Sequence, residues 1–196
     1  MEHGASVVAQ NQPSHNDYAV PQLQDNCPPL LDEAAYQSSV ATVELLRSNG
    51  APLGPRTLHL AARRITQVHQ SNLAAAGPAS HDRRLSDKDL ANTWEERVAI
   101  IKHLVDNLAQ DVNARDLPDS TVRATYDGNP LCYVARLRAS TGDCKEAVHF
   151  LLDKGADLEQ RDNRGNKVME PATKTRQEEF IAAVQNWRAQ QRSAES

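Results

Sequence analysis

Cys132 and His149 are the two residues of this 196-residue chain that come closest to a nucleophile and its base. Cys132 stands near the start of an expected helix at 130–135, where the positive end of the helix dipole favours a thiolate. Catalysis would also require an orienting group within reach, and the sequence supplies none at a recognisable spacing. Cysteine is a common small buried residue, so we expect Cys132 to belong to the core.

The histidines do not follow a metal-binding pattern. His59 lies within the apolar segment 57–62, where a structural role is favoured. His69, His81 and His103 lack a ligand spacing such as H-E-x-x-H. The phosphate-binding and nucleophile-elbow motifs G-x-G-x-x-G, G-x-x-x-x-G-K-[ST] and G-x-S-x-G are missing from the sequence. We therefore expect a protein that is not an enzyme and that needs no cofactor or metal.

The composition favours packed helices over a broad sheet. Hydrophobic residues make up 39% of the chain and aromatic residues only 4%, and an interior rich in Ala and Leu needs few rings. No run of about 18 apolar residues is present, so we expect no membrane-spanning helix. Cys27, Cys132 and Cys144 are too widely spaced for a disulfide framework or a zinc quartet, which indicates a reducing compartment, cytoplasmic or nuclear.

Three segments share one pattern, an amphipathic helix end followed by Gly or Ala and an extended exit. They are 43–53, 101–114 and 148–158. Gly50 and Gly155 occupy the place after a helix end where positive φ is common. A shorter apolar helix precedes each segment, at 30–35, 57–62 and 130–135, and a degenerate fourth copy covers 162–172 and 178–187.

These segments resemble the ankyrin repeat family. Thr57-Leu-His-Leu-Ala-Ala62 is similar to the family's T-P-L-H-x-A core without the proline, and Asp127-Gly-Asn-Pro-Leu131 is similar to its entry into a first helix. Gly155-Ala-Asp-Leu158 and Asp162-Asn-Arg-Gly165 are similar to its exit and its next finger. The resemblance implies an all-α solenoid of helix pairs with short β-hairpin or loop fingers. The long fingers and the helical insert resemble the divergent ankyrin repeats of fungal proteins.

The repeat boundaries divide the chain into a tail, four repeats and a second tail. We expect a disordered tail at 1–25, an ankyrin repeat domain at 26–187 and a C-terminal tail at 188–196. The repeats fall at about 26–55, 56–115, 116–161 and 162–187. The spacing of 56–115 exceeds the family period of about 33 residues, which places a helical insert at 63–93.

The insert carries two helix predictions. Residues 63–76 prolong the first helix of repeat two, and Thr93 with Glu96 forms a capping box that starts a second helix over 93–107. Apolar residues at helical spacing are expected in the core: Leu31, Ala34, Val43, Leu46, Leu60, Ala61, Ile101, Leu104, Leu131, Val134, Val148, Leu151 and Ile181.

Basic residues recur after the first helix of each repeat, although the net charge is −4. Arg63, Arg136 and Lys174 hold matching positions, and Tyr36 holds the same position in repeat one. The resemblance implies that they line one concave face. We expect a protein partner, acidic or mixed, to bind there through Arg and Tyr anchors. The expected contact residues are Tyr36, Arg63, Arg64, Tyr126, Tyr133, Arg136, Arg161, Arg164 and Lys174.

The favoured function is therefore a non-catalytic interaction module, such as an adaptor, an inhibitor or a regulatory subunit. The alternative is an enzyme or small-molecule binder with a pocket between the insert and the concave groove. That pocket would be lined by Trp94, His69, His81, His103 and Arg83. Nucleic-acid binding is the weakest option, because no aromatic residues alternate with the arginines and the chain is acidic overall.

Overall fold

The computed structural model describes residues 29–65, 87–116, 128–136, 144–162, 164–174 and 177–194, with the backbone alone for 87–93. This part of the chain is all-α, as expected. Within these ranges no β-strand forms, and the expected β-hairpin fingers are not seen; one isolated antiparallel bridge joins Arg161 to Lys167. The tail at 1–25 and most of the insert, including the predicted extension over 66–76, lie outside the described residues.

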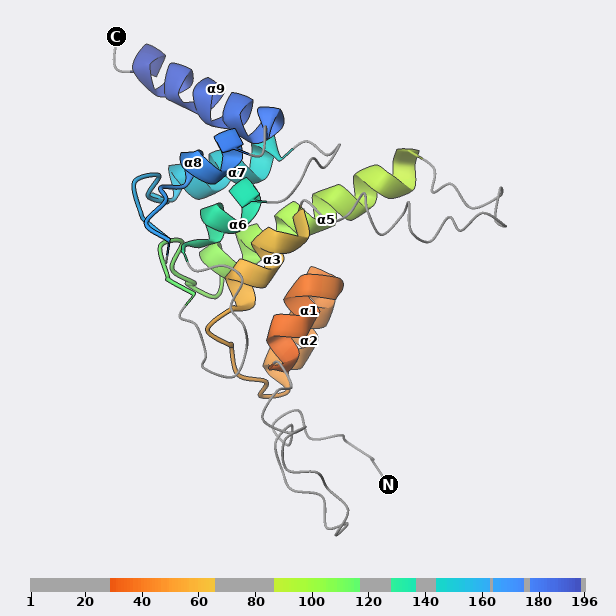
Figure 1. The fold of residues 1–196 in the computed structure, drawn as a ribbon. Helices are drawn as coiled ribbons and strands as arrows, with labels where there is room; N and C mark the ends of the chain where they lie inside the picture. Colours follow the sequence, from red (N-terminus) through yellow and green to blue (C-terminus); the bar gives the residue numbers. More distant parts are fainter. Residues whose placement is uncertain are drawn as a thin grey trace, which may run out of the picture.

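The helices form two rows (Figure 1). The first row consists of α1 (Leu30–Gln37), α3 (Thr57–Ile65), α6 (Pro130–Arg136) and α8 (Met169–Lys174), each in contact with the next. The second row consists of α2 (Val40–Ser48), α5 (Asp87–Asp106), α7 (Lys145–Asp153) and α9 (Glu178–Ala194), again in contact in that order. Each first-row helix also packs on the following second-row helix, so the chain is a stack of four helix pairs.

The core lies between the two rows, and its composition explains the close approach of the helices. Ala34, Ala35, Ala61 and Ala62 are buried in the first row, where small side chains allow neighbouring helices to pack tightly. The predicted core is largely confirmed. Leu46, Leu60 and Ile181 are only partly buried, and the other expected core residues are buried.

Three second-row helices, α2, α5 and α7, end in turns of the same kind. Gly50 and Gly155 both have φ 87°, which confirms the left-handed conformation expected at these positions. The N–H of Ala51 donates to the carbonyl of Leu46 at 3.0 Å, and the N–H of Ala156 donates to that of Leu151 at 2.9 Å. Ala109 takes the matching place after α5 with φ 53°, although it has a side chain.

The turn between α2 and α3 fits closely against α1. Gly54 is buried there, and a Cβ atom added to it would lie 2.2 Å from the Asp32 carboxylate. The Thr57 hydroxyl donates to that carboxylate, and the Gly54 N–H donates to the same hydroxyl at 3.0 Å. This turn is therefore held by a buried polar contact with α1.

Two helix boundaries differ from the prediction. Helix α5 begins at Asp87, so Thr93 lies inside it and does not cap it. Residues 87–92 contain neither Gly nor Pro, so nothing in them stops a helix. Helix α9 continues to Ala194, beyond the expected start of a tail at 188, because residues 188–194 are mainly the helix formers Ala, Arg and Gln.

Candidate partner-binding surface

The C-terminal ends of the first-row helices hold the residues predicted for partner binding. Tyr36 lies near the end of α1 and Arg63 near the end of α3, while Arg136 and Lys174 are the last residues of α6 and α8. Because α1, α3, α6 and α8 contact one another in sequence, these positions lie on successive helices of the first row. The surroundings of the four side chains differ greatly.

Tyr36, Arg63 and Arg64 form a cluster between α1 and α3, called the Tyr36 cluster below. The guanidinium carbons of Arg63 and Arg64 lie 5.9 and 5.4 Å from the centre of the Tyr36 ring. Both distances are within the range of cation–π attraction. All three side chains are half-buried, so the cluster is partly open to solvent. The structure thus brings together three of the predicted contact residues.

Arg97 approaches the Tyr36 cluster from α5, and the sequence analysis did not identify it. It is 7% exposed, and its guanidinium donates to the carbonyls of Tyr36, Gln37 and Ser38 at 3.2, 3.3 and 3.0 Å. These carbonyls stand at the negative end of α1, where a cation is favoured. Burial, followed by the positive charge of Arg64, lowers the pKa of Arg97. An arginine immediately before the core residue Val98 was the only available signal.

Glu96, next to Arg97, holds the start of α2. Its carboxylate accepts a hydrogen bond of 2.8 Å from the N–H of Val40, the first residue of that helix. An anion at a helix N-terminus is favoured by the dipole. Arg97 therefore binds the negative C-terminal end of α1, and Glu96 binds the positive N-terminal end of α2. Together they hold the turn between these two helices.

Arg136 is in a different state from the exposed cation that its position predicted. Its side chain is 9% exposed, and its guanidinium pairs with the carboxylate of Asp162, which is 1% exposed. Asp162 also accepts N–H groups of Arg164 and Asn166, each at 2.8 Å. Arg136 thus joins the end of α6 to the loop before α8 and has little surface to offer a partner.

Tyr133 is also buried, at 1% exposure, and does not form an exposed anchor. Its hydroxyl donates to the carboxylate of Asp116, and Arg56 pairs with the same carboxylate at 3.0 Å. Burial, followed by the hydrogen bond to Asp116, raises the pKa of Tyr133 well above its usual range. Neither Arg56 nor Asp116 was identified from the sequence, and Tyr126 lies outside the described residues.

His59 connects α3 with two loop segments, which agrees with the structural role expected for it. Its Nε2 lies 2.9 Å from the carbonyl of Ala114 and 3.2 Å from that of Gly128. Two carbonyl acceptors require that Nε2 carry the proton. The Nδ1 atom is buried and has no hydrogen-bond partner among the described residues. Burial lowers the pKa of His59, so the imidazole is held neutral.

The C-terminal end of the predicted surface is more open. Arg161, Arg164 and Lys174 are exposed. Arg161 donates to the carbonyl of Gly165 at 2.6 Å, and Lys174 donates to the side chain of Asn166 at 3.2 Å. None of the three forms an ion pair with a described carboxylate. Their charges are therefore available to an approaching acidic group.

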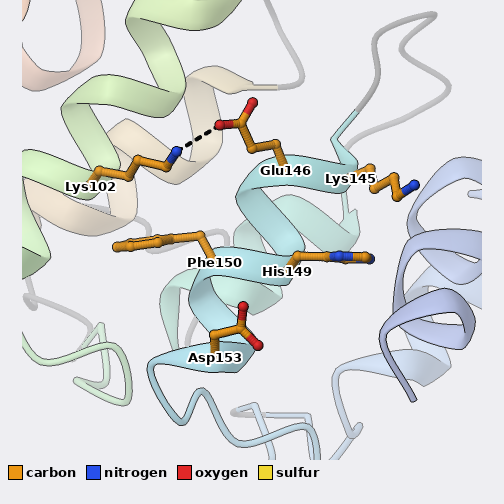
Figure 2. Close-up of a pocket in the computed structure, with 6 residues that line it drawn as sticks. All are labelled: Lys102, Lys145, Glu146, His149, Phe150 and Asp153. Carbon is orange, nitrogen blue, oxygen red and sulfur yellow. Dashed lines mark hydrogen bonds and ion pairs between the residues drawn. The ribbon is translucent and has the colours of Figure 1, made fainter. Parts of the chain in front are cut away.

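An open hollow of about 410 Å³ lies on the second row, along α7 (Figure 2). Lys102 pairs with Glu146 at 2.7 Å across α5 and α7, and Phe150 points toward α5. His149 Nε2 lies 3.0 Å from the carbonyl of Ala183, and the Trp187 indole donates to Asp153 at 2.7 Å. The side chains lining the hollow thus fasten α7 to its neighbours, and this arrangement places no nucleophile beside a base.

The alternative small-molecule pocket gains no support from the described residues. Trp94 packs against the core, and His103 lies 3.7 Å from the exposed Glu44 carboxylate. His69, His81 and Arg83 lie outside the described residues. Cys132 is buried, as expected. Over the described ranges, no group of three potential ligands could hold a metal ion.

The chain was compared with known protein families and with curated proteins. No protein-family model matches the chain, and no curated protein matches it. Among the described helices, none combines the length and the apolar character needed to cross a membrane.

Proposed function

We propose that the chain is a divergent ankyrin-repeat protein whose stack of helix pairs is a solenoid of that type. Three features support this assignment. The pairs are stacked in two rows, the turns after α2 and α7 share one geometry, and His59 in the T-L-H-L-A-A segment connects two loops. A stack of this kind exposes an extended surface suited to binding a protein chain.

We further propose that it acts as a non-catalytic interaction module, an adaptor, inhibitor or regulatory subunit in class. The observation that carries this proposal is the Tyr36 cluster, in which two guanidinium groups flank a half-buried ring at the edge of the first row. Tyr and Arg are the residue types that most often dominate binding energy at interfaces. An acidic or mixed protein segment is the partner that this surface fits.

The binding surface proposed here comprises the Tyr36 cluster together with Arg161, Arg164 and Lys174. Arg136 and Tyr133 lie beneath it and have a positioning role, because their polar groups are used within the fold. The surface therefore has two positive ends, one at α1–α3 and one at the loop before α8. A partner segment that spans both ends would contact three of the four helix pairs.

Charge reversal with a matched control tests this proposal. The face variant carries Arg64→Glu, Arg164→Glu and Lys174→Glu. The outer variant carries Arg47→Glu, Arg188→Glu and Arg192→Glu on exposed positions of α2 and α9, with the same change in net charge. Partners captured by the wild type and identified by mass spectrometry should be retained by the outer variant and lost by the face variant. Equal retention by both variants would exclude this surface.

A further inference from the structure

The end turn of α2 (residues 47–50) contains the one Asn–Gly pair of the chain, Asn49–Gly50. An asparagine followed by glycine loses its side-chain amide without an enzyme when the next backbone nitrogen attacks the side-chain carbonyl carbon. Glycine has no Cβ atom, so its nitrogen approaches that carbon with little steric hindrance. Asn49 and Gly50 are both exposed, so water reaches them. The pair therefore has the residue types and the solvent access that this reaction requires.

The folded end turn holds the pair in an unreactive arrangement. The side-chain amide of Asn49 donates to the carbonyl of Leu45 at 2.7 Å, and the N–H of Gly50 donates to the carbonyl of Arg47 at 3.0 Å. The reaction requires the Gly50 nitrogen to meet the side-chain carbon of Asn49, so both hydrogen bonds must break first. The reaction therefore needs the end turn to open.

Few contacts oppose this opening. Val43 is the buried residue of α2, whereas residues 47–50 are all exposed. A side-chain bond closes the turn, because the Arg47 guanidinium donates to the carbonyl of Ala51 at 3.2 Å. Exposed helix ends open locally at a much smaller free energy than the whole fold. We therefore expect the end turn to open while the stack stays folded.

We propose that Asn49 is a site of spontaneous deamidation, controlled by opening of the end turn of α2. In the open turn the Gly50 nitrogen gives its proton to water and bonds to the side-chain carbonyl carbon of Asn49. The bond from this carbon to Nδ2 breaks, and Nδ2 takes up a proton and leaves as ammonia. Water then opens the cyclic succinimide at either carbonyl, which gives aspartate or isoaspartate. Water is the co-reactant, and nothing is oxidised or reduced.

Neither product can rebuild the end turn. A carboxylate at position 49 accepts hydrogen bonds and does not donate them, so the bond to the Leu45 carbonyl is lost. The carboxylate also adds a negative charge at the negative end of the helix dipole. Isoaspartate inserts a methylene group into the backbone just before Gly50, which has φ 87°. Deamidation therefore favours the open turn and shortens α2.

The turn after α7 has the same geometry without the reactive amide. Lys154 and Gly155 follow α7 as Asn49 and Gly50 follow α2, and Gly155 also has φ 87°. The N–H of Gly155 donates to the carbonyl of Leu152 at 2.9 Å, as the N–H of Gly50 does in its own turn. A lysine therefore fits this kind of turn, and Asn49→Lys is the matched control that cannot deamidate.

The rate of conversion in the full chain tests the site. The chain and a synthetic peptide of residues 48–56 are incubated together at pH 7.5. Trypsin cuts after Arg47 and Arg56 and releases the same peptide from the chain, and chromatography with mass spectrometry then separates Asn49 from both products. We expect conversion in the chain to be at least about tenfold slower than in the peptide, which corresponds to an opening free energy of about 1.4 kcal/mol. No conversion in the chain while the peptide reacts would overturn the proposal, and equal rates would contradict control by the fold.

Opening of the turn is tested in two further ways. Unfolding the chain in urea should raise the rate at Asn49 to about that of the peptide. Arg47→Ala removes the side-chain bond that closes the turn, so it should raise the rate in the folded chain about twofold or more. Arg188→Ala, at an exposed position on α9, should leave the rate unchanged. A rate that urea does not raise, or equal rates in the two variants, would contradict control by the end turn.

The consequence for the fold is measured on aged protein. Asn49→Asp copies one product and should unfold at a lower urea concentration than the wild type. Asn49→Lys should be at least as stable as the wild type, because a cation is favoured at a helix C-terminus. Aged wild type should gain a less stable population, while aged Asn49→Lys should not. Equal urea midpoints for the wild type and Asn49→Asp would contradict the claim that the product opens the turn. This inference does not depend on the proposed function, so the capture experiment and the ageing experiment fail independently.

Discussion

Arg136 and Asp162 form an ion pair that joins the end of α6 to the loop before α8, with both side chains almost fully buried. By its place in the repeat pattern, Arg136 is equivalent to Arg63 and Lys174, yet its charge is used inside the fold. The pair thus separates two positive regions of the surface and connects two successive helix pairs. The pair therefore stabilises the fold and positions the loop before α8 against α6.

Removing the cation of this pair should destabilise the fold. Arg136→Met keeps much of the side-chain volume but leaves the Asp162 carboxylate buried without its counter-ion. Breaking a buried pair in this way costs about 3–5 kcal/mol, so the free energy of unfolding in urea should fall by about 3 kcal/mol. Arg164→Met, at an exposed position, should change it by less than about 0.5 kcal/mol. Similar small effects in both variants would mean that the pair is not buried in solution.

Burial of His59 predicts a pH-dependent stability. Its folded pKa is lowered from 6.5, so below about pH 6.5 the unfolded state binds more protons than the folded state. Stability should therefore fall as the pH decreases, by at most about 1.4 kcal/mol per pH unit for this group. Urea unfolding at pH 7.5, 6.5 and 5.5 measures the loss.

His59→Gln is the control for this prediction, because glutamine keeps an N–H donor for the loop carbonyls but does not titrate. The loss of stability between pH 7.5 and pH 5.5 should be smaller in the variant than in the wild type. Other groups, such as Asp32 with its pKa raised by burial, act equally in both proteins and cancel in the difference. Parallel stability curves would show that His59 is not held neutral in the fold.

Ala109 provides a stabilising substitution. It has φ 53° after α5, where Gly50 and Gly155 occupy the corresponding turns after α2 and α7. A left-handed conformation costs a residue with a side chain about 1–2 kcal/mol, and the greater freedom of glycine in the unfolded chain offsets about 0.4–1 kcal/mol of the gain. Ala109→Gly should therefore raise the free energy of unfolding by roughly 0.5–1 kcal/mol. The same change at Ala41, an exposed site within α2, should lower it.

The sequence predicted the features of this fold that depend on local periodicity. Apolar spacing located both helices of each pair, and glycine chemistry located the turns at Gly50 and Gly155. The capping-box pattern at Thr93 was misleading, because Thr followed by Glu three residues later also occurs inside a helix such as α5. Local signals therefore gave the elements but not all of their ends.

The site was harder to predict because its contacts join residues far apart in the chain. Tyr36 and Arg63 hold matching places in the predicted repeats, Arg64 follows Arg63, and the structure brings the three side chains together. No local pattern indicates that Arg136 would meet Asp162, that Tyr133 would meet Asp116 or that Arg97 would reach the end of α1. Whether a charge is exposed or paired depends on such contacts, and these decide which predicted residues remain available to a partner.

The central claim is that the first-row edge binds the partner. The most direct test is the rate of association between the protein and its captured partner, measured at increasing salt for the wild type, the face variant and the outer variant. Screening at physiological ionic strength acts over about 8 Å, so the wild-type rate should fall steeply with salt. The face variant should associate slowly and with little salt dependence, while the outer variant follows the wild type and all three keep similar melting temperatures. Equal rates and equal salt dependence in the two variants would contradict the claim that the first-row edge binds the partner.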